Sequence, residues 1–382
     1  MNLPSIRLLA IFLLLASCNL DVIDPVEPVY TFETRIAGLN GAAASGYDIW
    51  QTADTGYIVF GWTQTPSGTA DFYQLKFDKK GVQESAKAFG SGGYDYVATS
   101  FVQGPGAYII GGESDGKFYV GRTDANGNQT WTYTGETGYC TSVVPTNDGN
   151  LLAIGNQYGG VNTLSDIVLV KLSLTGTTIW TRKISTNVAE YGNQVVAESG
   201  TSFMIGGWQT ANGNSDAMLI RVDANGNEVL RKTYSASGTN FDYANGMSKT
   251  SDGGFILIGR TEPDGINSNI YVQKVDNALN AEWQKTFGDS GYDNGKRVIE
   301  LQEGGFAVMG EVSFASFPVT WLAKLSASGQ EVWVKTYDTG SADEYPLGLR
   351  QARDKGFVIT GATYEPSGGN ILLIKTDPDG NL

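Results

Sequence analysis

Five acidic residues recur at equivalent places in this 382-residue chain and are the first candidates for chemistry. Each stands thirteen residues before the aromatic residue that opens the next apolar run; they are Asp95, Glu190, Asp242, Asp293 and Glu344. A ring of carboxylates can hold a cation or a basic partner, and a pair can act as acid and base on a glycosidic bond. Carboxylates also cap backbone N–H groups where a chain enters a strand, and their regular spacing favours this structural role.

Two tyrosines, Tyr94 and Tyr292, directly precede two of these acids. Their rings offer flat faces for stacking a sugar, although a tyrosine at the start of a strand more often packs against its neighbours. With the five acids they form the set of candidate ligand-binding residues. A catalytic pair normally departs from a repeat consensus, whereas these acids are the consensus. We therefore predict no catalytic residue, and a binding module is favoured over an enzyme.

The composition excludes several kinds of chemistry. The chain has no histidine, which rules out Ser-His-Asp triads, histidine-ligated metals and imidazole bases. We expect no metal and no cofactor. Lysine and arginine number 26 against 40 acidic residues, a net charge of −14, with no basic patch. Phosphate binding needs such a patch, so we expect no nucleic-acid partner.

The N-terminus has the form of a signal peptide. Residues 1–17, MNLPSIRLLAIFLLLAS, contain one basic residue followed by a short apolar run, too short for a spanning helix. The tetrapeptide Leu15-Ala16-Ser17-Cys18 resembles a bacterial lipobox. That resemblance implies cleavage before Cys18 and acylation of this residue, which would anchor the protein to a membrane. The alternative is a chance cysteine at the end of an ordinary secretory signal.

The segment after Cys18 is polar, acidic and rich in proline, as expected of a tether over residues 18–28. Asn19 after the cysteine resembles the pattern of lipoproteins sent to the outer membrane of Gram-negative cells. Removal of residues 1–17 leaves 25 basic and 40 acidic residues, a net charge of −15. Cys140 is then the only thiol besides Cys18, so we expect stability to come from packing and not from a disulfide.

Residues 29–382 consist of repeats with a period near 50 residues. Seven apolar runs are each followed by glycine; they begin at Gly56, Ala107, Asn150, Ser202, Gly254, Gly305 and Gly356. A second run alternates between apolar and polar residues and leads, in most repeats, into a turn that begins with Asp, such as 124–127 or 377–380. Short alternating runs between glycine turns, together with this period, predict an all-β propeller. A plain turn is favoured over a calcium loop, since the turns lack the carboxylates of an EF-hand.

A third run carries a bulky residue at one position in six of the seven repeats: Phe32, Trp131, Trp180, Leu230, Trp283 and Trp333. The spacing of Asp, Gly and Trp resembles the tryptophan-docking motif of quinoprotein-type propellers, and the strand order resembles that of kelch-type propellers. The first resemblance covers only the turn and the tryptophan, and the chain offers no set of quinone or metal ligands. We interpret the tryptophans as wedges between blades; a stacking platform for a ligand is the alternative.

The two ends of the chain predict ring closure. The last repeat ends at Leu382, where a tryptophan run is due, and residues 30–36 have the form of that run, with Phe32 at the position of Trp333. We therefore predict a single seven-bladed propeller with four-stranded blades, in which the N-terminal strand completes the last blade and removes the open sheet edges.

The longest and most varied loops are expected on the face where the inner strands begin. We predict a protein or glycan ligand on this loop face of a lipid-anchored protein of the cell envelope. The competing hypothesis is a carboxylate-dependent polysaccharide hydrolase or lyase that uses some of the five acids. A third is a quinone-dependent dehydrogenase.

Overall fold

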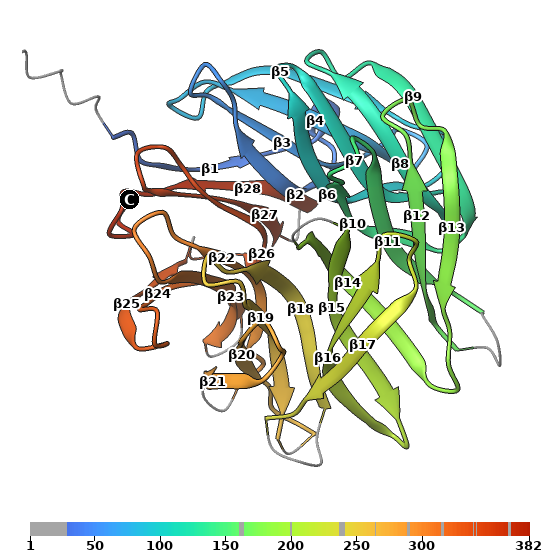
Figure 1. Cartoon of the computed structure of the whole chain (residues 1–382). Helices are drawn as coiled ribbons and strands as arrows, with labels where there is room; N and C mark the ends of the chain where they lie inside the picture. The colour runs from blue at the N-terminus through green and yellow to red at the C-terminus, as the bar shows by residue number, and fades with distance from the viewer. Residues whose placement is uncertain are drawn as a thin grey trace, which may run out of the picture.

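The computed structural model describes residues 29–382 except 160–163, 199–200, 237–240, 264, 289–290, 315–316, 339, 341 and 366–367. The signal peptide, Cys18 and the tether to residue 28 lie outside the described residues. The described chain forms seven four-stranded antiparallel sheets around a common centre, which confirms the seven-bladed β-propeller (Figure 1). A short 3-10 turn spans Leu39–Gly41. Within the described ranges, no helix is long and apolar enough to cross a membrane.

The inner two strands of each blade surround the centre (Figure 1). The innermost strands are β2 (Ala44–Gln51), β6 (Asp95–Gly104), β10 (Tyr139–Pro145), β14 (Ala189–Ala197), β18 (Phe241–Lys249), β22 (Asn294–Glu300) and β26 (Asp343–Gln351). The second strands are β3 (Tyr57–Gln64), β7 (Ala107–Ser114), β11 (Leu151–Gln157), β15 (Ser202–Ala211), β19 (Phe255–Glu262), β23 (Phe306–Phe314) and β27 (Phe357–Glu365).

The outer two strands complete each blade. The third strands are β4 (Ala70–Phe77), β8 (Lys117–Asp124), β12 (Asp166–Leu172), β16 (Asn214–Asp223), β20 (Asn269–Val275), β24 (Phe317–Leu325) and β28 (Gly368–Lys375). The outermost are β5 (Gln83–Phe89), β9 (Gln129–Thr137), β13 (Thr178–Ile184), β17 (Glu228–Tyr234), β21 (Ala281–Phe287), β25 (Glu331–Tyr337) and β1 (Phe32–Ile36). We number the blades one to seven from β2, so that β26, β27, β28 and β1 form blade seven.

Strand β1 closes the ring as predicted. It pairs antiparallel with β28, with Phe32 opposite Lys375, in the register that places Trp333 opposite Lys324 in blade six. Figure 1 shows β1 alongside β28 near the C-terminus. Because the last blade takes its outer strand from the start of the chain, the propeller keeps no unpaired outer edge at the seam.

The hydrophobic core lies between neighbouring blades. At the seam, Ile49 and Val59 of blade one pack with Val358 and Ile371 of blade seven, all fully buried. The second and third strands are buried on both faces, because each blade is covered on either side by another. This explains their nearly continuous apolar runs, whereas the outermost strands alternate between exposed and half-buried residues.

The tryptophans act as wedges between blades. Each packs on the turn glycine of the next blade; for example, a Cβ built on Gly176 would come within 2.6 Å of the Trp131 ring, and one on Gly329 within 2.9 Å of Trp283. These glycines have φ of 83° and 75°, so both the backbone and the close ring require glycine. Trp131 also donates its indole N–H to the carbonyl of Leu174 at 2.9 Å.

Two ends of the ring can now be distinguished. We call the end where the inner strands begin the loop face; it also carries the connections from second to third strands. The opposite end, the turn face, carries the turns from third to outermost strands. The chain enters β1 on the turn face, since Phe32 pairs with Lys375 at the end of a third strand.

Candidate functional site

The five predicted acids lie at the start of their inner strands and are buried, with 0 to 1% of their surface exposed. Asp95 accepts the backbone N–H of Ser91 through Oδ2 at 2.7 Å, and Asp242 accepts that of Ala236 through Oδ2 at 3.1 Å. Both donors belong to the loop that leads into the inner strand. These contacts fix the loop where it crosses from one blade to the next.

The other three acids bond within their own blade or to its neighbour. Asp293 accepts the N–H of Ser313 at 3.1 Å, and Glu344 accepts that of Thr320 in the preceding blade at 3.3 Å. Glu190 forms a salt bridge through Oε1 with Nη1 of Arg231, at 3.1 Å. Four of the five carboxylates thus accept backbone N–H groups, as the capping interpretation predicts. Side chains this deeply buried do not form an exposed acidic rim. In blades one and three the equivalent positions are held by Ala44 and Gly138, which have no carboxylate.

Residues that follow these acids point to the opposite side of the strand and reach the mouth of the central channel. In four blades this residue is a tyrosine: Tyr96, Tyr191, Tyr243 and Tyr345. Tyr139 has the same register in blade three, where it stands opposite Asn156 as Tyr191 stands opposite Trp208. All five rings are partly exposed.

Other aromatic side chains extend this set into a belt on the loop face, to which every blade contributes. The aromatic belt consists of Tyr47, Trp62, Tyr94, Tyr96, Tyr139, Tyr158, Tyr191, Trp208, Phe241, Tyr243, Tyr292, Tyr345 and Tyr364, all partly or well exposed. Aromatic residues are normally buried or scattered at the surface of a protein, so such a concentration on one face makes it a candidate interaction site.

Contacts within the belt run from blade to blade. The rings of Tyr191 and Trp208 stack with centroids 3.8 Å apart and planes 18° apart, and Trp208 meets Tyr243 of the next blade edge to face at 4.9 Å. On the other side of the ring, Trp62 meets Tyr96 at 5.6 Å. These mutual contacts restrict the rotamers of the rings, so the flat faces are held in place before any ligand arrives.

Both predicted tyrosines belong to the belt and are among its most exposed members, Tyr94 at 49% and Tyr292 at 45%. Tyr94 stacks with Tyr96 at 6.3 Å. The Tyr292 hydroxyl accepts a hydrogen bond from Nη1 of Arg260 at 2.9 Å. The same guanidinium lies 4.3 Å from the ring centroid of Tyr243. The structure thus brings the predicted tyrosines onto the loop face and leaves the predicted acids beneath it.

A cavity of about 320 Å³ opens on the loop face where blades six, seven and one meet. It is lined by Tyr47, Lys296, Asp343, Tyr345 and Tyr364, among others. Burial raises the pKa of the three tyrosines further above its ordinary value, at which a phenol is already protonated at neutral pH. Each phenol therefore has an O–H group that can donate a hydrogen bond.

Each inner strand has a bulge a few residues after its start. Side chains at the bulges bridge to the next blade: Thr141 Oγ1 donates to the carbonyl of Gly192 at 2.6 Å, and Asn193 Nδ2 to that of Ala244 at 2.8 Å. Bulges of this kind re-aim side chains and often lie beside functional sites.

The deeper channel contains a hollow of about 610 Å³ with several basic side chains. Arg350 pairs with Asp48 at 2.9 Å and covers the ring of Trp50 at 4.1 Å. Burial lowers the pKa of the neighbouring Arg297 guanidinium. The lining also includes the carboxylates of Asp48 and Glu300, which offset two of its three basic side chains.

The Asp-rich turns behave as plain turns. Asp124 accepts the backbone N–H groups of Asn126 and Asn128 through Oδ1 at 2.8 and 2.9 Å, which lowers the pKa of its carboxyl together with a bond from the Asn128 side chain. In the part of the chain that the structure describes, no group of three or more Cys, Asp or Glu side chains is arranged to hold a metal ion.

The inner-strand tyrosines were not predicted from the sequence, although a signal for them is present. An acid–tyrosine dipeptide opens the inner strand in four blades, at 95–96, 190–191, 242–243 and 344–345. Since successive strand residues point to opposite sides, a buried acid places its neighbour at the channel mouth. The belt's two tryptophans, Trp62 and Trp208, share a repeat position directly after the glycine of the second strand, but only two blades have tryptophan there.

No protein-family model and no curated protein matches this sequence. Solved structures do share its fold. An ulvan lyase of polysaccharide lyase family PL25, bound to -[GlcA(1-4)Rha3S]-, superimposes with a TM-score of 0.59 and 10% identity over 90% of this chain and 96% of that chain. A streptogramin B lyase superimposes with a TM-score of 0.56 and 12% identity over 91% of this chain and 98% of that chain. The Neurospora crassa Pan2 WD40 domain superimposes with a TM-score of 0.56 and 9% identity over 93% of this chain and 99% of that chain. At such identities the likeness shows the fold alone.

Proposed function

We propose that this protein is a lipid-anchored binding module of the bacterial cell envelope, whose loop face holds a glycan. The observation that carries the proposal is the aromatic belt, with thirteen aromatic side chains from seven blades around one mouth. A sugar ring has an apolar C–H face and a hydroxyl edge. Rigid aromatic rings with polar groups between them suit both parts of such a ligand.

The polar groups of the belt match hydroxyl groups. The protonated phenols of Tyr345 and Tyr364 donate hydrogen bonds, and the Arg260 guanidinium and Lys296 ammonium stand among carboxylates such as Glu262 and Glu311. A net charge of −15 for the acylated chain disfavours a strongly acidic ligand. We therefore assign a neutral oligosaccharide to this face, in preference to a protein ligand.

The expected anchor fits this arrangement. Acylation at Cys18 would hold the protein to a membrane through the tether at residues 18–28, in the outer membrane if the Asn19 pattern is followed. Because the chain enters β1 on the turn face, the tether would leave from the side opposite the aromatic belt. The loop face would then point away from the membrane, free to meet an extended polymer.

The glycan assignment is tested by applying the purified protein to an array of neutral and acidic oligosaccharides. We expect retention on at least one neutral oligosaccharide and weaker retention on sulfated or uronic acid-containing ones. A protein that binds nothing on the array contradicts the assignment. For the anchor, Cys18→Ala should release the protein from membranes, and unchanged membrane retention would contradict acylation.

The competing function is a carboxylate-dependent hydrolase or lyase, and two of the solved structures with this fold are lyases. Burial of the five acids weighs against it, since a catalytic carboxylate must reach its substrate. Asp242→Asn and Glu190→Gln test it directly. If either variant keeps the fold and abolishes a measured turnover of a polysaccharide, the protein is an enzyme and the binding-module proposal is wrong.

A further inference from the structure

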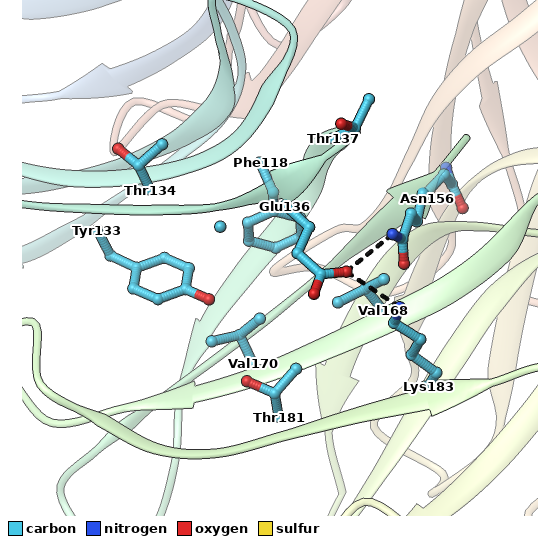
Figure 2. A pocket seen from close by; sticks show the side chains of 12 residues that line it. Phe118, Tyr133, Thr134, Glu136, Thr137, Asn156, Val168, Val170, Thr181 and Lys183 are labelled. Atoms are coloured by element: carbon cyan, nitrogen blue, oxygen red, sulfur yellow. Dashed lines mark hydrogen bonds and ion pairs between the residues drawn. The ribbon is translucent and has the colours of Figure 1, made fainter. Parts of the chain in front are cut away.

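A cavity of about 340 Å³ lies between blades two and three, away from the aromatic belt. Phe118 and Tyr133 of blade two form one wall, and Val168, Val170 and Thr181 of blade three form the other (Figure 2). The volume lies at the lower end of the range for small-molecule sites and suffices for one ring.

The cavity exists because one blade departs from the repeat. Four residues after the wedge position, each outermost strand has a bulky side chain that fills the space toward the next blade. These residues are Ile36, Phe89, Ile184, Tyr234, Phe287 and Tyr337 in six blades, and Gly135 in blade two. Repeat consensus residues serve packing, so a departure that leaves an unfilled space points to a role other than packing.

Glycine at position 135 is not required by the backbone. Gly135 is absent from the residues with positive φ, so another residue could adopt its conformation. A Cβ added there would lie 3.2 Å from the Tyr133 hydroxyl oxygen and 3.3 Å from the Phe118 Cβ, close contacts that require both Tyr133 and Phe118 to move by a few tenths of an ångström. The missing side chain therefore keeps the cavity open and meets no conformational need.

The polar end of the cavity has unused hydrogen-bond acceptors. Glu136 accepts two hydrogen bonds on the same oxygen, Oε2 (Figure 2). One comes from Gln157 Nε2 at 2.9 Å and the other from Lys183 Nζ at 3.1 Å. The amide oxygen of Gln157 is buried and has no hydrogen-bond partner among the described residues. Turning the amide over would place that oxygen against the Glu136 carboxylate, so the orientation is determined. A buried acceptor without a donor is unfavourable unless a ligand supplies one.

We infer that this cavity binds a single neutral aromatic ring that carries one hydrogen-bond donor, of the size of a simple phenol. The ring lies against Phe118, Val168 and Val170, and its O–H group donates to the free oxygen of Gln157. A neutral ring is favoured because Lys183 and Glu136 already neutralise each other as an ion pair, and a charged ring would lose its hydration against the apolar wall without gaining a free counter-charge.

The test uses p-cresol as the probe and toluene as its donor-free analogue, with calorimetric titration of the purified protein. We expect saturable binding of p-cresol, about tenfold tighter than that of toluene, because one buried hydrogen bond separates the two. Failure of p-cresol to bind the native protein overturns the inference. Equal affinities for the two probes overturn the assignment of the donor.

Two variants and a control locate the site. Gly135→Ile installs the residue of blade three and should abolish p-cresol binding, whereas Thr132→Ile, an exposed position on the same strand, should leave binding unchanged. Gln157→Leu should reduce p-cresol affinity to that of toluene. If Gly135→Ile does not fold, Gln157→Leu decides alone: unchanged p-cresol affinity in this variant contradicts the site.

A tyrosine-containing tripeptide distinguishes the source of the ring. Tighter binding of p-cresol than of the peptide indicates a free small phenol, whereas tighter binding of the peptide indicates a polypeptide side chain. Both outcomes keep the cavity as the site. Because these residues lie outside the aromatic belt, failure here leaves the glycan proposal standing, and failure of the glycan array leaves this one standing.

Discussion

Ring closure places Phe32 in contact with two blades at once, and a double-mutant cycle can measure that contact. The strand that carries Phe32 pairs with β28 of blade seven, while its ring packs on Gly81 and meets Tyr57 of blade one at 6.0 Å. A Cβ on Gly81, whose φ is 79°, would come within 2.7 Å of the Phe32 ring. The two residues form the last wedge of the ring.

The size of each effect follows from this geometry. Truncating a fully buried phenylalanine costs about 3 to 5 kcal/mol, so Phe32→Ala, at a half-buried site, should cost about 2 kcal/mol. Gly81→Ala adds about 1 kcal/mol of left-handed backbone strain and about 1 to 3 kcal/mol of overlap with the ring. With Phe32 already removed, only the strain remains. The double variant should therefore be less destabilised than the sum, by about 1 to 3 kcal/mol.

Urea unfolding of the native protein, Phe32→Ala, Gly81→Ala and the double variant gives four free energies of unfolding, compared at a constant m-value. Their differences give the coupling energy between Phe32 and Gly81. As a control, Phe317→Ala removes a phenylalanine that is 57% exposed in blade six, and its cycle with Gly81→Ala should be additive. Additivity of Phe32→Ala and Gly81→Ala to within about 0.5 kcal/mol would refute the contact across the seam.

Two further predictions concern the repeated stabilising contacts. Bonds from Lys171 and Thr146 lower the pKa of Asp148 to about 2, so this pair stabilises the fold above the unfolded pKa near 4 and loses its effect as the pH falls toward 2. Asp148→Asn should destabilise the protein at pH 6 and leave urea midpoints at pH 2 unchanged; an equal loss at both values contradicts this. Leu279, fully buried at φ 65°, fills the place left where Leu230 replaces a wedge tryptophan. Leu279→Gly should cost about 1 to 4 kcal/mol, since lost burial exceeds relieved strain, and adding Leu230→Trp should recover part of it by melting temperature.

Most of the fold was predictable from the sequence because the repeat specifies it many times over. The wedge position alone, from Phe32 to Trp333, aligns the outermost strands and reveals that blade seven borrows one from the N-terminus. The substitution of Leu230 for tryptophan is matched by Leu279 in place of the turn glycine of the next blade. Blade one differs, because Ser85 stands at its wedge position and the next blade keeps its turn glycine, Gly127.

The candidate site was predictable only in part. The loop face and the exposed tyrosines Tyr94 and Tyr292 follow from the strand order. The burial of the acids does not, because the loops that cover Asp95 and Glu190 come from the end of the preceding blade. The contact of Trp208 with Tyr243 joins residues 35 positions apart across two blades and recurs between Trp62 and Tyr96, but the order of the repeats alone does not show that these rings meet.

The most direct test of the central claim is the affinity of Trp208→Ala for whichever oligosaccharide the native protein retains on the array. Trp208 stacks on one belt residue and meets another, so its loss should weaken binding about tenfold or more without a change in fold. Val332→Ala, which truncates an apolar side chain 57% exposed on an outermost strand, should leave the affinity unchanged. Equal affinity of Trp208→Ala and the native protein would contradict a glycan site built on the aromatic belt.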